Sequence, residues 1–189
     1  MNKADELKSR NLRGQLDRLV MSALDFRHAL SAATFLLEEV DWSRVYRIEE
    51  QRRFKCYETT MVVAYARPFT QARGRSAPFS WKLVQPGFAL TGAEKALHEK
   101  LYRLRNELHA HSDDSASLIT SEIWRTRLPE GGTFDFLSIA GGEELVFTFD
   151  EVQAIHNFLW KVRHHVDNAV QTHPAPRDHL PVVVRDLWG

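Results

Sequence analysis

Apolar residues alternate in steps of three and four along two long stretches of the chain. Such steps place side chains on one face of an α-helix and form the seam by which helices of a bundle or coiled coil pack. In the first stretch these residues are Leu16, Leu19, Ala23, Phe26, Leu30, Ala33 and Leu37. In the second they are Val152, Ile155, Leu159, Val162, Val166 and Ala169. The two seams predict a long helix near each end of the chain.

Two further helices are predicted between these seams. For the first, Ser43 is the expected N-cap, and Pro68 disfavours helix at the residue before it and is expected to end or kink the helix there. Its inward side is expected to hold Val45, Ile48, Tyr57, Met61, Ala64 and Tyr65. The second begins with a capping box, in which Thr91 is answered by Glu94 three residues later. Its apolar stripe comprises Leu97, Leu101, Leu104 and Leu108, and His111 is the next position on it.

The remaining segments predict loops and a small sheet. Residues 70–90 are rich in Gly, Pro, Ser, Arg and aromatic residues and are expected to form a long loop. Three β-rich runs, 119–127, 134–139 and 145–149, are separated by glycine-containing turns and predict an antiparallel meander over about residues 118–149. Asp150, with Gln153, is then expected to cap the last helix. The tail, 173–189, contains three prolines and is expected to be extended, packing on the body or on a second subunit.

Together these elements predict a mainly α fold: a four-helix-type bundle with a small antiparallel β-meander inserted before the last helix. A length of 189 residues with 43% hydrophobic content suits a single domain, residues 1–189, with one core. Cys56 is the only cysteine, which excludes a disulfide or a cysteine-based zinc site within one chain.

Charge and hydropathy restrict the partners and the compartment. Lys plus Arg and Asp plus Glu number 25 each, so nucleic-acid binding would have to depend on a local patch rather than on an overall basic field. No run approaches the roughly 20 apolar residues of a membrane span, and the first residues lack the apolar core of a signal peptide. We therefore expect no membrane partner and a cytoplasmic location.

Arginine, asparagine and histidine are concentrated at the end of the third predicted helix, in residues 101–113. Arg105 lies beside the apolar stripe, so its long side chain can reach toward the spot that His111 faces. Histidine takes or gives a proton near neutral pH, and arginine stabilises charge that grows on a phosphate. These groups suit cleavage of RNA by its own 2′-hydroxyl. We expect Arg105, Asn106 and His111 to be catalytic and His109 and Asp113 to be supporting, with no metal and no cofactor.

The segment Arg105-Asn-Glu-Leu-His-Ala-His111 resembles the signature of the HEPN (higher eukaryotes and prokaryotes nucleotide-binding) superfamily of helical-bundle proteins. That signature is an arginine, often followed by a polar residue such as asparagine, and a histidine after four to six intervening residues. Here five residues intervene, and the sequel Ser112-Asp113 is similar to the form seen in several bacterial members. The resemblance covers mainly this helix, and the predicted meander departs from the minimal bundle.

The resemblance implies a metal-independent endoribonuclease whose two copies pair their motifs across a dimer interface, often in a toxin or phage-defence context. The partners that it implies are a second copy of the chain, RNA, and an antitoxin or regulatory protein. Other members of the superfamily are catalytically silent. The alternative is therefore a non-catalytic dimeric binding or regulatory module of the same fold.

Several of these residues also have other interpretations. Arg103 and His109 share the same separation, but only Arg105 is directly followed by asparagine. His111 could be a satisfied core residue, or could be favoured by the helix dipole. The side chains of His109 and His111 would point in different directions on a regular helix, which argues against their binding one metal ion. A basic-aromatic stretch could hold single-stranded RNA by stacking and charge, although packing of its rings on the bundle is the favoured interpretation. This stretch comprises Arg67, Arg73 and Arg75 with Phe69, Phe79 and Trp81.

Overall fold

The structure, a computed structural model, describes residues 3–70, 77–107, 120–140, 144–178 and 180. Over these residues the fold is mainly helical, with a two-stranded antiparallel sheet before the last helix, which confirms the predicted fold class. The elements are α1 (Lys3–Glu39), α2 (Ile48–Ala66), the 3-10 helices η1 (Arg67–Phe69) and η2 (Trp81–Val84), α3 (Gly92–Glu107), β1 (Thr120–Arg127), β2 (Thr133–Ala140) and α4 (Phe149–Thr172). Within the described ranges, every helix is too short or too polar to cross a membrane.

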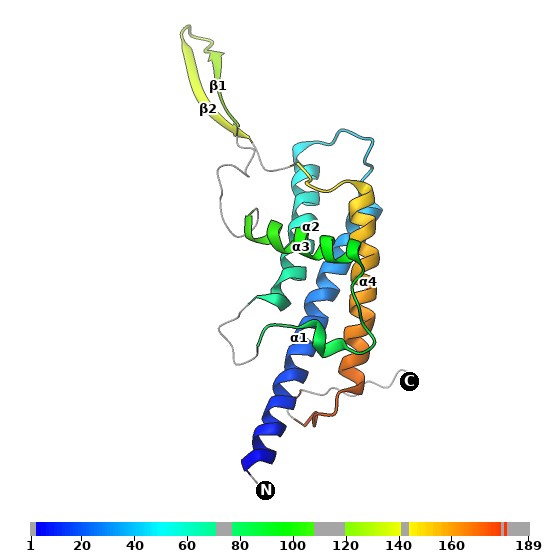
Figure 1. The fold of residues 1–189 in the computed structure, drawn as a ribbon. Helices are drawn as coiled ribbons and strands as arrows, with labels where there is room; N and C mark the ends of the chain where they lie inside the picture. Colours follow the sequence, from blue (N-terminus) through cyan, green and yellow to red (C-terminus); the bar gives the residue numbers. More distant parts are fainter. Residues whose placement is uncertain (1–2, 71–76, 108–119, 141–143, 179, 181–189) are drawn as a thin grey trace, which may run out of the picture.

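The long helices α1, α2 and α4 lie alongside one another, with α1 packed on both of the others (Figure 1). α2 and α4 run opposite to α1, whereas α3 crosses over α2 instead of joining the bundle lengthwise. The hairpin of β1 and β2 projects away from the helices. The start of α1 and the end of α4 lie at the opposite end of the bundle from the hairpin.

The predicted seams of α1 and α4 form the core. Every α1 seam residue from Leu16 to Ala33 is buried, and Leu37 is partly buried against them. On α4, the seam from Val152 to Val166 is buried and Ala169 packs at its edge. The seam prediction is confirmed because a three-four spacing places these side chains on the one side of each helix that faces its neighbours.

The predicted start of α3 is confirmed. The backbone N–H of Thr91 donates to Glu94 Oε2 at 2.7 Å, and the N–H of Glu94 donates to Thr91 Oγ1 at 3.2 Å, which is a complete capping box. Leu101 and Leu104 are buried and Leu97 is partly buried. Leu108 lies outside the described residues.

The predicted N-caps of α2 and α4 are wrong. α2 begins at Ile48 with Arg47 as N-cap, while Ser43 donates from both its N–H and its hydroxyl to Asp41 Oδ1 in the preceding turn. Val45 is consequently 92% exposed, and Ile48 is exposed too. α4 begins one residue before Asp150, and its capping box is formed by Thr148 and Glu151 rather than by Asp150 and Gln153. In both cases the predicted cap, Ser43 or Asp150, is a polar residue close in sequence to the true N-cap.

The sheet has two strands, so the expected meander is a hairpin. β1 pairs with β2 in the register Trp124↔Phe136, and Gly131 and Gly132 take positive φ in the turn. The third β-rich run, 145–149, is not a strand. Its alternating apolar residues resemble a strand pattern, but they have other roles. Phe147 packs in the helical core, where it is 3% exposed, and Phe149 begins α4.

The described part of the 70–90 segment packs against the helices. Phe79, Val84 and Phe88 are buried, and Trp81 in η2 stacks on Phe88. These contacts confirm that the aromatic residues of this segment pack on the bundle. α2 ends at Ala66, as Pro68 predicted, and η1 follows. The start of the C-terminal tail also packs on the body, since Ala175 is buried.

Replacing Leu104 with alanine should lower the free energy of unfolding by about 2 to 5 kcal/mol, because it removes a core side chain of α3. The matched control is Leu24→Ala on α1, where the same atoms are removed from a leucine that is 42% exposed, with an expected change within about 0.5 kcal/mol. Urea denaturation of both variants measures the difference. Equal effects at the two positions would contradict the core position of Leu104.

Candidate functional site

Arg105 and Asn106 lie together at the C-terminal end of α3. Arg105 Nη1 donates a hydrogen bond to Asn106 Oδ1 at 2.9 Å, and both side chains are partly buried. Within the described ranges, the Arg105 guanidinium forms no ion pair with a carboxylate. The Asn106 amide therefore orients the Arg105 guanidinium. Buried Leu104, the preceding residue, anchors this turn of the helix in the core.

The other predicted site residues divide between the described and the undescribed parts of the chain. His109, His111 and Asp113 lie outside the described residues, and so do Arg73 and Arg75. The structure thus brings Arg105 and Asn106 together and leaves their relation to His111 a prediction.

Arg67 is described and has a structural partner. Its Nη1 lies 3.6 Å from Asp25 Oδ1 on α1, and its side chain is 58% exposed. Burial raises the pKa of Asp25, although Arg67 acts in the opposite direction. This ion pair joins η1 to α1. Arg67 thus has a structural role in addition to the RNA-binding role that the sequence suggested.

His98 is a histidine of α3 that the sequence prediction overlooked. Its Nδ1 lies 2.7 Å from the hydroxyl of Tyr65, and its ring is surrounded by aromatic rings, with Phe69 at 4.7 Å and Trp81 at 5.6 Å between centroids. Burial lowers the pKa of His98 and raises that of Tyr65 well above its ordinary value. The imidazole and the phenol therefore share one hydrogen bond, whose donor depends on the tautomer of His98, and this bond gives the buried hydroxyl of Tyr65 a partner.

The position of His98 on its helix could have been found from spacing. His98, Tyr102 and Arg105 are separated by four and then three residues, so they share one side of α3. The His98 and Tyr102 rings lie 6.3 Å apart. The hydrogen bond of His98 with Tyr65 fixes α3 against α2.

Two ion pairs fix α3 against α4. Lys161 on α4 donates to both carboxylate oxygens of Glu94, and Lys100 on α3 pairs with Glu151. Burial raises the pKa of Glu94, but the hydrogen bonds from Lys161 and Thr91 outweigh it and leave this pKa below its usual value. The hydrogen bond from Lys100 likewise lowers the pKa of Glu151. Each carboxylate therefore takes part both in a helix cap and in an ion pair. The two ion pairs join α3 to α4 and so fix the direction of α3.

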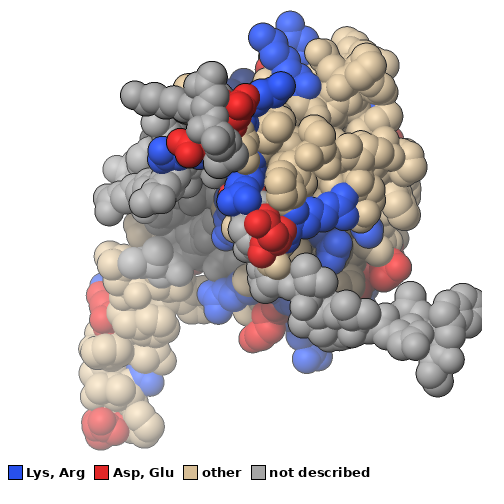
Figure 2. All heavy atoms as spheres, turned by 90° about the horizontal axis from the view of Figure 1, so that it is seen from below, with Lys and Arg blue, Asp and Glu red and all other residues tan. Residues whose placement is uncertain are grey.

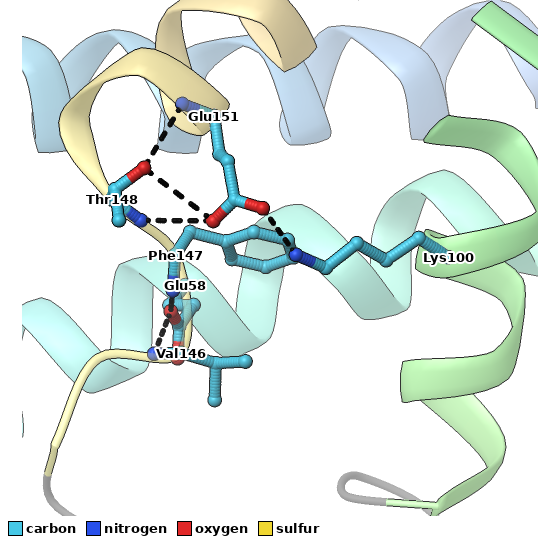
Figure 3. Close-up of polar contacts among 6 residues, drawn as sticks. All are labelled: Glu58, Lys100, Val146, Phe147, Thr148 and Glu151. Atoms are coloured by element: carbon cyan, nitrogen blue, oxygen red, sulfur yellow. Dashed lines mark hydrogen bonds and ion pairs between the residues drawn. The ribbon is translucent and has the colours of Figure 1, made fainter. Parts of the chain in front are cut away.

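A buried carboxylate holds the segment that leads from the hairpin into α4. Glu58 on α2 is 1% exposed, and its Oε1 accepts the backbone N–H groups of Val146 at 2.7 Å and Phe147 at 3.1 Å. Its Oε2 accepts from Lys55 Nζ at 2.7 Å. Figure 3 shows Glu58 with Val146 and Phe147, beside the pair of Lys100 and Glu151. Lys100 Nζ lies 4.8 Å from the centre of the Phe147 ring. Glu58 and Lys100 together place Phe147 between α2 and α3.

The surface charges of the described residues are mixed. On the face seen in Figure 2, Lys and Arg side chains lie among Asp and Glu, next to a broad uncharged area. A groove of about 650 Å³ beside α1 is lined by Arg10, Arg13 and Arg18, but Arg13 pairs with Asp178 and Arg18 Nε donates to the Ala77 carbonyl. Arg13 and Arg18 therefore already contact other parts of the fold.

No family model, curated protein or solved structure matches the chain. In the part of the chain that the structure describes, no three His, Cys, Asp or Glu side chains are grouped as ligands of one metal ion would be.

Proposed function

We propose that the chain is a metal-independent endoribonuclease of the HEPN type, acting in a toxin or phage-defence system. The observation that carries the proposal is the Arg105 guanidinium at the end of α3. It is partly buried, it is oriented by Asn106, and no carboxylate among the described residues neutralises it. An arginine held in this way suits a phosphate ligand, because a planar guanidinium donates two parallel hydrogen bonds to a phosphate.

The proposed reaction uses the substrate's own nucleophile. The 2′-oxygen of a ribose attacks the adjacent phosphorus while His111 accepts the hydroxyl proton, and the bond from phosphorus to the 5′-oxygen of the next nucleotide breaks. The leaving oxygen takes up a proton, so the products are a 2′,3′-cyclic phosphate and a 5′-hydroxyl. Arg105 stabilises the negative charge that grows on the non-bridging phosphate oxygens. In this proposal the partner subunit of a homodimer contributes the second copy of the motif.

A second candidate function is a non-catalytic binding module, and the hairpin supports it. Trp124, Phe134 and Phe136 are exposed along one face of the hairpin, while Ile123 and Leu137 are exposed on the other. A two-stranded hairpin with apolar side chains on both faces suits contact with a partner, such as an antitoxin or regulatory protein.

Purified protein incubated with mixed RNA in excess chelator should cleave the RNA and leave matched single-stranded DNA intact. DNA lacks the 2′-hydroxyl that acts as the nucleophile. No divalent ion is required, because the arginine stabilises the charge on the phosphate and the imidazole accepts the proton of the 2′-hydroxyl. Gel analysis of both substrates, with and without added magnesium, is the measurement. Cleavage that requires magnesium, or that proceeds equally on DNA, would contradict the proposal. Absence of cleavage on every RNA tested would favour the binding module.

A further inference from the structure

The hairpin of β1 and β2 is left uncovered by the described residues of the chain. The two strands pack mainly on each other, and every residue in 121–137 is exposed. Its exposed apolar side chains are Trp124, Phe134 and Phe136 on one face and Ile123 and Leu137 on the other. An isolated two-stranded hairpin is at best marginally stable in water, and further strands or a packed helix are what stabilise one. We therefore expect another chain to complete this sheet.

The outer edge of β2 is the edge that is open to pairing. In the described part of the chain the sheet has two strands, so the outer N–H and C=O groups of each strand have no ladder partner. Proteins usually protect such an edge with charged side chains or proline. β1 carries three charged residues, Glu122, Arg125 and Arg127, whereas β2 carries Asp135 alone and has no proline.

The single charge of β2 is already paired within the hairpin. Arg125 Nε and Nη2 donate to the two carboxylate oxygens of Asp135 at 2.7 and 2.8 Å. The rest of β2 is apolar or uncharged, with Phe134, Phe136 and Leu137 in its first five residues. A strand of this composition favours pairing with another strand over exposure to water.

A second copy of the chain fits this edge by charge and by symmetry. Lys plus Arg and Asp plus Glu number 25 each, so two copies have no net charge repulsion to overcome. A two-fold axis between two antiparallel copies of β2 places one residue opposite its own copy. Asp135 at that position would set two carboxylates against each other, which is unfavourable. Phe136 would set two aromatic rings opposite each other, which is favourable.

We propose that β2 pairs antiparallel with β2 of a second copy, so that the two hairpins form one four-stranded sheet with Phe136 at the two-fold axis. Trp124 lies opposite Phe136 within the hairpin, and the pairing extends this row of rings across all four strands. Residues 133–139 of the two copies would form roughly six to eight backbone hydrogen bonds, within the ~10 ± 5 of a typical interface. The hairpin projects away from the helices, which leaves the edge of β2 accessible to the second copy (Figure 1). The pairing goes beyond the proposed function and does not depend on RNA cleavage.

The test uses the full chain without RNA. Sedimentation velocity over a micromolar concentration series should show that the wild type dimerises. Phe136→Glu and Phe136→Lys should each raise the dissociation constant of the dimer about tenfold, because like charges then face each other at the axis in place of two rings. An equal mixture of the two variants should dimerise about tenfold more tightly than either variant alone, since a carboxylate then faces an ammonium group. Recovery in the mixture identifies the partner as a second copy.

Trp124→Glu and Trp124→Lys are the matched control, because Trp124 lies on the same face, directly across from Phe136. In the proposed sheet the two copies of residue 124 are three strand spacings apart, about 14 Å, which exceeds the Debye length of ~10 Å at 0.1 M salt. Their mixture should therefore dimerise no more tightly than either variant alone. Far-UV circular dichroism should show the same helix content in all four variants, because both side chains are exposed and lie outside the helical core.

Three results would overturn the pairing. A wild type that remains monomeric throughout the series would leave the hairpin to a different protein. Phe136 variants that dimerise as tightly as the wild type, or whose mixture shows no gain, would remove Phe136 from the axis. A gain in the Trp124 mixture and none in the Phe136 mixture would place β1 at the interface instead.

Discussion

Replacing Arg105 with alanine should lower the rate of metal-free RNA cleavage by about 10²- to 10³-fold, which is the usual effect of removing one group that stabilises charge in the transition state. His111→Ala should lower it by about 10²- to 10⁴-fold, the usual contribution of a positioned acid or base. The measurement is single-turnover cleavage of one labelled RNA in chelator. Neither rate should be restored by magnesium, because neither residue is proposed to hold a metal.

The sharpest control is the neighbouring arginine-histidine pair of equal spacing. Arg103→Ala and His109→Ala change the same residue types two positions earlier in the chain, and Arg103 lies on a different side of α3 from Arg105. Their rates should remain within about threefold of the wild type, a difference of under ~1 kcal/mol. If Arg103→Ala and His109→Ala abolished cleavage while Arg105→Ala and His111→Ala did not, the site would belong to the other register.

Stability has to be measured alongside activity for Arg105. Its guanidinium contacts the side chain of Asn106 and, within the described residues, joins no salt bridge. We therefore expect Arg105→Ala to change the free energy of unfolding by under ~1 kcal/mol, in contrast to the loss of about 2 to 5 kcal/mol expected for Leu104→Ala. Melting curves that show equal damage at both positions would make Arg105 a structural residue and remove its catalytic assignment.

The helices could be predicted from sequence because their information is local. Leu19 and Phe26 on α1, and Ile155 and Val162 on α4, are buried as their three-four spacing requires. The box of Thr91 and Glu94 spans three residues, so nothing distant was needed to recognise it. The contact between the Arg105 and Asn106 side chains is equally local, because the two residues are neighbours in the chain.

The features that could not be predicted depend on contacts between distant residues. Phe147 looks like part of a third strand until it is known that Glu58, nearly ninety residues earlier, binds its backbone N–H. The orientation of α3 across α2 follows from the bond between Tyr65 and His98 and from the ion pair of Lys161 with Glu94. The spacing of apolar residues within one helix carries no information about such contacts between distant residues. Glu58 itself, one acid in an ordinary helical sequence, carries no signal of its burial.

Glu58→Ala should lower the free energy of unfolding by about 3 to 5 kcal/mol, the usual effect of removing one member of a buried, hydrogen-bonded charge pair. The change leaves two backbone N–H groups, those of Val146 and Phe147, without their acceptor. It also removes one of the two partners of Lys55 Nζ, whose other acceptor is the Glu144 carbonyl. Urea denaturation monitored by circular dichroism measures the loss.

Two variants separate the roles of charge and hydrogen bonding at Glu58. Glu58→Gln keeps one carbonyl oxygen for the two backbone N–H groups but loses the ion pair with Lys55, so its effect should be smaller than that of alanine, about 1 to 3 kcal/mol. Glu49→Ala removes an exposed acid from the first turn of the same helix and should change stability by under ~1 kcal/mol. If Glu58→Ala were as mild as Glu49→Ala, the segment before α4 would not depend on Glu58.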